Sequence, residues 1–140
     1  MPRAFVDTNV LVYAAEEVNP LSRKGRIARE LLLQPGLCLS VQVLNEFIAN
    51  ARHPHKLNLS RKQEGEWISQ WLQLPVIPLT LDSFAGALEI HLRYGLSHWD
   101  SLIVFCAQST GCEFLYSEDL SHGQMYETTQ VINPFRNVEV

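Results

Sequence analysis

The sequence predicts an α/β fold with a mostly parallel sheet, and three observations support this fold class. Short apolar runs of strand length alternate along the chain with longer segments of helical pattern. Capping residues, prolines and glycines separate these segments. The 140 residues are 46% hydrophobic and 19% charged, which suits one packed core and leaves little material for a second. We therefore expect residues 1–140 to form a single domain.

Four apolar runs have the length and the boundaries of strands, and a fifth is possible. The first run ends at Asp7, and the third stands between two prolines. The expected strands are residues 4–6, 37–39, 76–77, 114–116 and, as the possible fifth, 130–132.

Six segments carry helical patterns, and residues that favour helix starts stand before several of them. Thr8, Ser22 and Ser97 can cap the helices that follow, and Ser60 with Gln63 forms a capping box. Glycine ends the fifth segment at Gly95. The expected helices are residues 8–17, 23–33, 41–52, 61–74, 81–94 and 98–110.

Several protein classes are excluded by what the sequence lacks. It contains no glycine-rich dinucleotide or phosphate-binding loop, no serine-nucleophile elbow and no zinc-protease motif. Cys38, Cys106 and Cys112 are odd in number and widely spaced, so we expect buried thiols and neither a disulfide framework nor a structural zinc site. No apolar run exceeds six residues and Asp7 interrupts any leader-like segment, so we expect a cytoplasmic protein without membrane spans.

Two acidic residues follow predicted strands. Asp7 comes directly after the first strand, and Asp119 lies just beyond residues 114–116. Because sites in parallel sheets form at the carboxyl ends of strands, both acids fall where a site is expected. Thr8 and Asn9 supply a hydroxyl and an amide that can orient a carboxylate. A helix cap is the competing interpretation of Asp7.

Two further acids lie on predicted helices. Glu46 borders a face on which we expect Val41, Leu44 and Ile48 to pack, and an acid among apolar neighbours is often partnered by a cation or a metal. A solvated glutamate is the alternative. Asp100 falls in the first turn of a strongly apolar helix, where the helix dipole alone favours an acid. If the four acids converge, their oxygen-only ligand set suits Mg²⁺ or Mn²⁺ and not zinc.

The net charge of −4 conceals a basic segment. Residues 23–62 hold eight basic and two acidic side chains, a balance of +6, while the rest of the chain stands at −10. The segment suggests a phosphate-facing surface with Arg23, Lys24, Arg26 and Arg29 as RNA-binding candidates. A solvated helix face or a partner interface are the alternatives.

Four motifs in order resemble those of PIN-domain ribonucleases, and together they are similar to the VapC-like toxins of bacterial toxin–antitoxin pairs. The D-T-N triplet alone would be weak, but four motifs in register over nearly the whole chain are specific. The motifs are Phe5–Tyr13, Val43–Phe47, Leu96–Val104 and Leu115–Gln124.

This resemblance implies a PIN-like three-layer α/β/α fold with four to five strands and a Mg²⁺-dependent endoribonuclease. It implies that the metal, Mg²⁺ or possibly Mn²⁺, activates water for in-line hydrolysis of RNA. The implied catalytic and metal-coordinating residues are Asp7, Glu46, Asp100 and Asp119, with Thr8 and Asn9 in support. Either Glu118 or Asp119 could be the fourth acid.

The resemblance also implies a cognate antitoxin as partner and a homodimer. Two alternatives stay open: a PIN-type RNA-processing nuclease without an antitoxin, and a catalytically silent PIN-like module that binds RNA or protein. A Mg²⁺-dependent phosphatase with Asp7 as nucleophile fits less well, because Asn9 stands where a second acid is usual.

Overall fold

A six-stranded sheet forms the centre of the computed structural model, which describes residues 2–136. Its strand order is β3-β2-β1-β4-β6-β5, and every neighbouring pair is parallel except β5 and β6. The strands are β1 (Ala4–Val6), β2 (Leu37–Ser40), β3 (Val76–Ile77), β4 (Phe114–Tyr116), β5 (Met125–Tyr126) and β6 (Thr129–Ile132).

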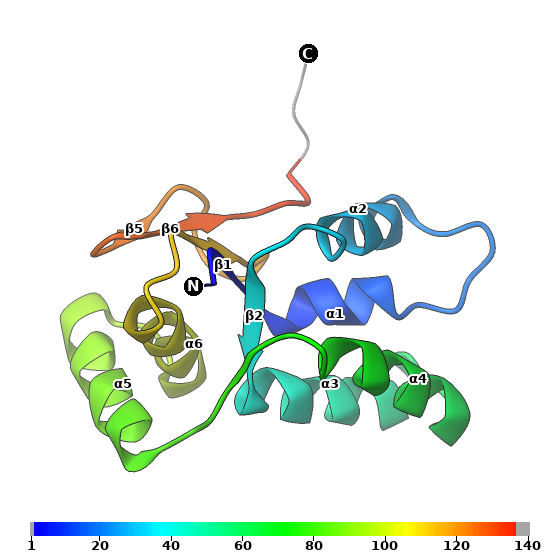
Figure 1. The fold of residues 1–140 in the computed structure, drawn as a ribbon, viewed down its shortest axis with the longest axis horizontal. Coiled ribbons are helices and arrows are strands. Elements are labelled where there is room, and N and C mark those ends of the chain that lie inside the picture. The colour runs from blue at the N-terminus through cyan, green and yellow to red at the C-terminus, as the bar shows by residue number, and fades with distance from the viewer. Residues whose placement is uncertain (1, 137–140) are drawn as a thin grey trace.

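Helices cover both sides of the sheet, which confirms the expected α/β/α arrangement. Helices α1 to α4 lie on one side, and α5 packs with α6 on the other (Figure 1). This division follows from the topology, because the connection from β3 at the edge back to β4 must cross the opposite face. The helices are α1 (Thr8–Ala14), α2 (Arg23–Leu31), α3 (Val41–Arg52), α4 (Arg61–Trp71), α5 (Leu81–Tyr94) and α6 (His98–Ser109).

The sheet has one strand more than expected. The extra strand, β5, contains two residues and pairs antiparallel with β6 through a tight turn, in which Glu127 has a φ of 54°. A strand of two residues offers no alternating pattern, and β5 has no flanking prolines of the kind that mark the other two-residue edge strand, β3.

The first helix is shorter than expected, ending at Ala14 and not near residue 17. The Arg29 side chain explains this end, because its guanidinium donates to the carbonyl oxygens of Ala14 at 2.8 Å and Glu16 at 3.1 Å. These two carbonyls have a partner from another helix and need no further helical turn.

The buried face of α3 also differs from the expectation. Val43, Phe47 and Ala51 are fully buried, whereas Val41, expected on the core face, is exposed. The ring of Phe47 meets Trp71 of α4 edge-on with centroids 4.5 Å apart. Apolar residues occur on several sides of this helix, so spacing alone allows more than one face, and contact with α4 selects one.

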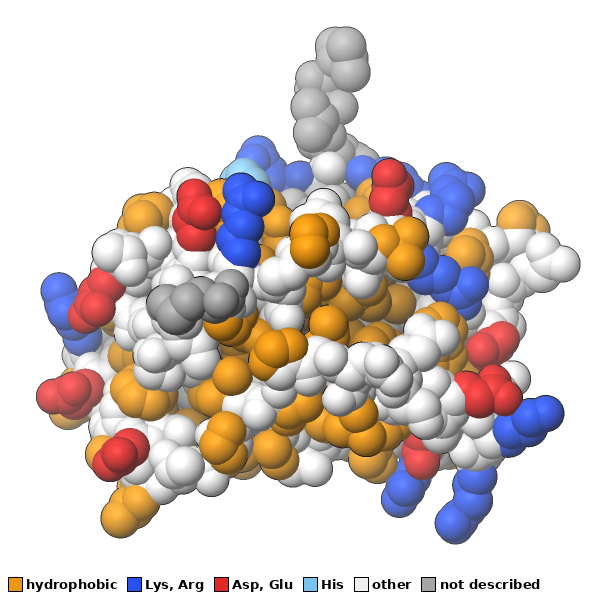
Figure 2. All heavy atoms as spheres, in the orientation of Figure 1, with side chains coloured by type: hydrophobic (Ala, Val, Ile, Leu, Met, Phe, Trp, Pro, Cys, Tyr) orange, Lys and Arg blue, Asp and Glu red, His pale blue; other side chains and the backbone are white. Residues whose placement is uncertain are grey.

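The interior consists of the strands and the helix faces above them. Phe5, Val6, Leu115 and Val131 are fully buried. On the face drawn in Figure 2, apolar side chains occupy the middle and charged ones stand mainly around the rim. The three cysteines are buried free thiols, as expected. Within residues 2–136, no helix has both the length and the apolar character that crossing a membrane requires.

Candidate active site

Asp7 is buried at the carboxyl end of β1, at the centre of the sheet, and only 4% of it is exposed. Its N–H donates to the carbonyl of Tyr116 at 3.0 Å, which continues the pairing of β1 with β4. One carboxylate oxygen accepts from Thr8 N at 2.7 Å, and the other accepts from the Ser117 hydroxyl at 2.7 Å. Asp7 is therefore the N-cap of α1, and the expectation that Thr8 is the cap was wrong. Asp7 has the extended backbone of a cap because it still belongs to the strand end.

Burial raises the pKa of Asp7 to about 7 from its ordinary value of 3.8. The hydrogen bonds from Ser117 and Thr8 lower this pKa, while the charges of Asp119 and Glu46 raise it. No basic side chain within residues 2–136 forms an ion pair with Asp7. A buried carboxyl group with a strongly perturbed pKa and no cation partner is typical of a functional site.

Glu46 links three helices at the edge of this site. Its Oε2 accepts from the Thr8 hydroxyl at 2.7 Å, and its Oε1 accepts from Gln42 Nε2 at 2.8 Å. The same Gln42 amide donates to the carbonyl of Trp99 at 3.0 Å, at the start of α6. Both oxygens of Glu46 are thus fixed by uncharged donors, which leaves its negative charge uncompensated.

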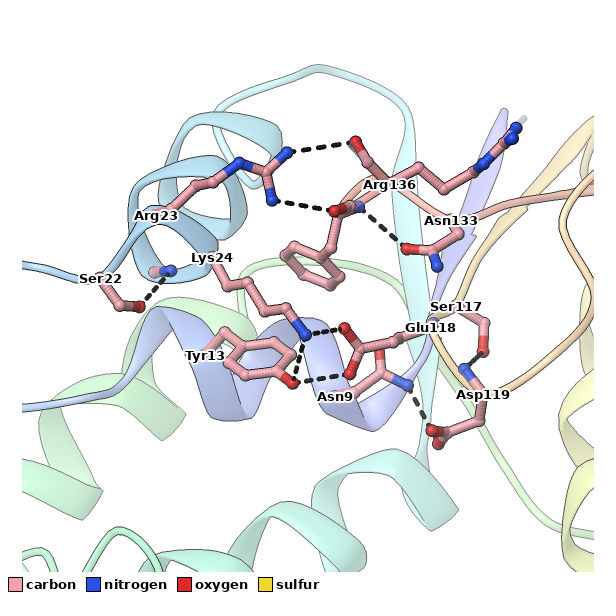
Figure 3. Close-up of polar contacts among 12 residues, drawn as sticks. Asn9, Tyr13, Ser22, Arg23, Lys24, Ser117, Glu118, Asp119, Asn133 and Arg136 are labelled. Carbon is pink, nitrogen blue, oxygen red and sulfur yellow. Dashed lines mark hydrogen bonds and ion pairs between the residues drawn. The ribbon is translucent and has the colours of Figure 1, made fainter. Parts of the chain in front are cut away.

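Asp119 is held from two sides (Figure 3). Asn9 Nδ2 donates to its Oδ2 at 3.2 Å, and its own N–H donates to the Ser117 hydroxyl oxygen at 3.2 Å. Ser117 therefore serves two acids, because its hydroxyl also donates to Asp7. The side-chain oxygen Oδ1 of Asn9 accepts from Glu118 N at 3.2 Å, so the Asn9 side-chain amide fixes this segment at two points.

Asp100 lies in the first turn of α6, where its N–H donates to the Ser97 hydroxyl at 3.1 Å. Burial raises the pKa of Asp100, and the charges of Asp119 and Glu46 raise it further. The same two charges act on Asp7. The charges of Asp119 and Glu46 thus reach both Asp7 and Asp100, although the four acids come from the end of β1, from α3, from α6 and from the segment after β4.

Glu118 faces away from these acids. Its Oε1 accepts from the Tyr13 hydroxyl at 2.6 Å, and its Oε2 accepts from Lys24 Nζ at 2.5 Å. Both oxygens are occupied within the protein (Figure 3). Of the two neighbouring acids, the geometry therefore favours Asp119 as the fourth member of the cluster.

The RNA-binding candidates at the start of α2 have partners within the chain. Arg23 donates to the carbonyl oxygens of Phe135 at 2.9 Å and Arg136 at 3.1 Å (Figure 3). Lys24 pairs with Glu118. Arg23 therefore binds the backbone at Phe135 and Arg136, and Lys24 binds the fourth motif through Glu118.

The other two candidates differ from each other. Arg29 binds the end of α1 and lies over the Trp67 ring, 5.1 Å from its centroid. Arg26 is exposed, and its side chain has no hydrogen bond or ion pair to any other residue of the range 2–136. Of the four, Arg26 is the cation left for an external anion.

Two site residues were missed in the sequence, Gln42 and Ser117. Gln42 stands four residues before Glu46, and residues at this spacing lie side by side on a helix, which is the signal that could have found it. Ser117 lies inside the fourth motif, between the strand and Asp119. Both orient acids through hydrogen bonds and are buried.

The donor set fits Mg²⁺ or Mn²⁺. All four acids offer oxygen atoms, which these hard cations prefer. The ion pairs of the described residues involve other acids, so the four charges are unneutralised within the protein. Among residues 2–136, however, no three acidic, histidine or cysteine side chains are arranged to hold a metal as they stand.

Solved structures with similar folds include several toxin–antitoxin proteins. A chain in a toxin–antitoxin complex from Klebsiella pneumoniae superposes with a TM-score of 0.72 at 20% identity, covering 96% of this chain and 99% of that one. VapC20 of Mycobacterium tuberculosis, described as a toxin that cleaves the sarcin–ricin loop, gives 0.65 at 19% identity, with 83% and 89% covered. DNA-bound VapBC from Salmonella typhimurium gives 0.67 at 19% identity, with 94% and 97% covered. At these identities the likeness shows the fold alone.

A search of curated protein sequences found no match. The model of the PIN domain family matches residues 4–127, which include all four acids and the whole sheet up to β5. The resemblance to PIN-domain proteins predicted from the motifs is thereby confirmed, and the similar solved structures include a VapC toxin and a VapBC complex. The chain belongs to the PIN domain family.

Proposed function

We propose that this protein is a Mg²⁺- or Mn²⁺-dependent endoribonuclease that acts as the toxin of a toxin–antitoxin pair. One observation supports the proposal: the charges of Asp119 and Glu46 act on both Asp7 and Asp100, and none of these four acids has a basic partner among residues 2–136. Such an arrangement is costly unless a cation binds there. Membership of the PIN family, whose members are typically nucleases, supports the same conclusion.

In this proposal Asp7, Glu46, Asp100 and Asp119 hold the metal. A bound Mg²⁺ would supply water activation and charge neutralisation at the scissile phosphate. The chain supplies orientation: Ser117 and the Thr8 N–H fix Asp7, and Gln42 fixes Glu46.

The test compares Asp7→Asn with Asp82→Asn, a matched change at an exposed aspartate on α5. We expect the parent and Asp82→Asn to cleave structured RNA with Mg²⁺ and to arrest bacterial growth. Asp7→Asn should lose at least about 100-fold in cleavage rate, because one ligand and the charge it contributes are removed. Circular dichroism checks that each variant is folded.

The second part of the proposal is that an antitoxin protein binds this chain. It is supported by similar solved structures that include toxin–antitoxin complexes. A short protein encoded beside this gene should restore growth when co-expressed with the parent and co-purify with it. Cleavage without such a partner would favour an RNA-processing nuclease. A parent that binds RNA and cleaves none with any divalent cation would make the protein a silent module.

A further inference from the structure

Lys24 and Glu118 form an ion pair that the candidate active site does not use directly. Lys24 belongs to the first turn of α2, while Glu118 lies between Ser117 and Asp119 in the segment after β4. The pair therefore connects a peripheral helix with the segment that contributes the fourth acid. We propose that Lys24 is a positioning residue that sets the metal affinity of the acid cluster by holding Glu118, and through it Asp119. This inference rests on the function proposed above.

The pair is tightly built and partly shielded from water (Figure 3). Lys24 Nζ lies 2.5 Å from Glu118 Oε2 and 3.3 Å from the Tyr13 hydroxyl, which itself donates to Glu118 Oε1 at 2.6 Å. The ammonium also lies 5.0 Å from the centre of the Tyr13 ring and 5.9 Å from that of Phe135. The exposed fractions of the two side chains are 40% for Lys24 and 24% for Glu118, so solvent screens this pair less than an open surface pair.

The helix that carries Lys24 is anchored where it begins. Ser22 caps α2 by accepting from Gly25 N, and the Glu16 carboxylate accepts from both the N–H and the hydroxyl of Ser22. A Cβ at Gly25 would lie 2.1 Å from that carboxylate, so only glycine permits this close approach without displacing Glu16. These contacts fix the start of α2 against the end of α1, and with it the origin of the Lys24 side chain.

At the other end of the pair, Glu118 is continuous with the site. Its N–H donates to Asn9 Oδ1, and the Nδ2 of the same amide donates to Asp119. The neighbouring Ser117 hydroxyl contacts Asp7 and the N–H of Asp119. A displacement of Glu118 would therefore be transmitted to the acids on both sides of Ser117.

The direction of the effect separates positioning from simple electrostatics. Lys24 is a cation close to an acid cluster, so its charge alone opposes the binding of a metal cation. Removal of that charge would then tighten metal binding. Loss of a positioning contact has the opposite effect, since changes to groups that orient metal ligands commonly cost 10- to 100-fold in metal affinity.

The experiment measures Mn²⁺ affinity by calorimetry, without any activity assay. We expect Lys24→Met to weaken Mn²⁺ binding at least about tenfold and Lys24→Arg to stay close to the parent. Arg26→Met, which removes the same charge from the same helix at an exposed side chain, should bind Mn²⁺ as tightly as the parent or slightly tighter. The double variant Lys24→Met with Glu118→Gln should bind no more than about threefold more weakly than the worse single variant, because both changes break one contact.

Each result decides the matter. Unchanged or tighter Mn²⁺ binding by Lys24→Met overturns the inference and leaves the proposed function standing. The same conclusion follows if the loss of Mn²⁺ affinity in the double variant equals the product of the losses in the two single variants. A parent that binds no Mn²⁺ overturns both. If Lys24→Met does not fold by circular dichroism, Lys24→Gln takes its place with the same two opposite expectations, because it also removes the charge.

Discussion

Replacement of Asp7 by asparagine should stabilise the metal-free protein at alkaline pH and not at acidic pH. Burial, the main cause, holds the pKa of Asp7 at about 7, against 3.8 for an unburied aspartate. The folded protein therefore holds the proton more tightly than the unfolded chain. The cost of ionising Asp7 in the fold is absent below about pH 4, grows as the pH rises to 7, and is fully present above it.

The size of the effect follows from the same two pKa values. Their difference, at about 1.4 kcal/mol for each pH unit, gives a penalty of at most about 4 kcal/mol above pH 7. Asparagine removes this penalty and offers one acceptor oxygen where Asp7 uses two, for Thr8 and Ser117. One lost hydrogen bond costs about 1 kcal/mol, and the Ser117 hydroxyl can accept from the new amide. The net gain at pH 8 is then about 3 kcal/mol, with a loss of up to about 1 kcal/mol near pH 4.

Urea unfolding in the presence of EDTA at pH 4, 6 and 8 measures this difference, with Asp82→Asn as the control for the amide change. The free energy of unfolding of Asp7→Asn should cross that of the parent between pH 4 and pH 7. If the two proteins keep a constant difference over this range, or if the variant is less stable at pH 8, Asp7 does not titrate as its burial requires.

Two further predictions concern α2. Arg29→Met should lower the free energy of unfolding by about 1–3 kcal/mol in a urea titration. The change leaves the carbonyls of Ala14 and Glu16 without their donor and removes the guanidinium from the Trp67 ring. Arg26→Met, the control, should stay within about 0.5 kcal/mol of the parent. Arg26→Met should also weaken RNA binding by an Asp7→Asn background protein and reduce the slope of log affinity against log salt by about one, and an unchanged slope would assign Arg26 to the solvated face.

The sequence by itself determined the fold class and most of the secondary structure. Strands β1, β3 and β4 and helices α3 and α5 have the expected bounds, because their ends carry local signals such as Gly95, which ends α5 with a φ of 72°. The positions of the acids relative to strand ends were also readable, since the carboxyl ends of parallel strands meet at one edge of the sheet. The order of the four motifs was enough to indicate the family that residues 4–127 match.

The tertiary structure decided what depends on contacts between distant segments. It shortened α1 through Arg29, gave the cap of α1 to Asp7 and selected the face of α3 through Trp71. It also distinguished Glu118 from Asp119 as the fourth acid of the cluster. The sequence does not distinguish these adjacent acids, whereas in the fold Lys24 forms an ion pair with Glu118. The four basic residues of α2 likewise have different roles because the fold places different carbonyl or carboxylate groups beside each side chain. Local propensity acts within a few residues, whereas the pKa of Asp7 and the partners of Lys24 depend on groups about a hundred positions away, which only the packed fold brings together.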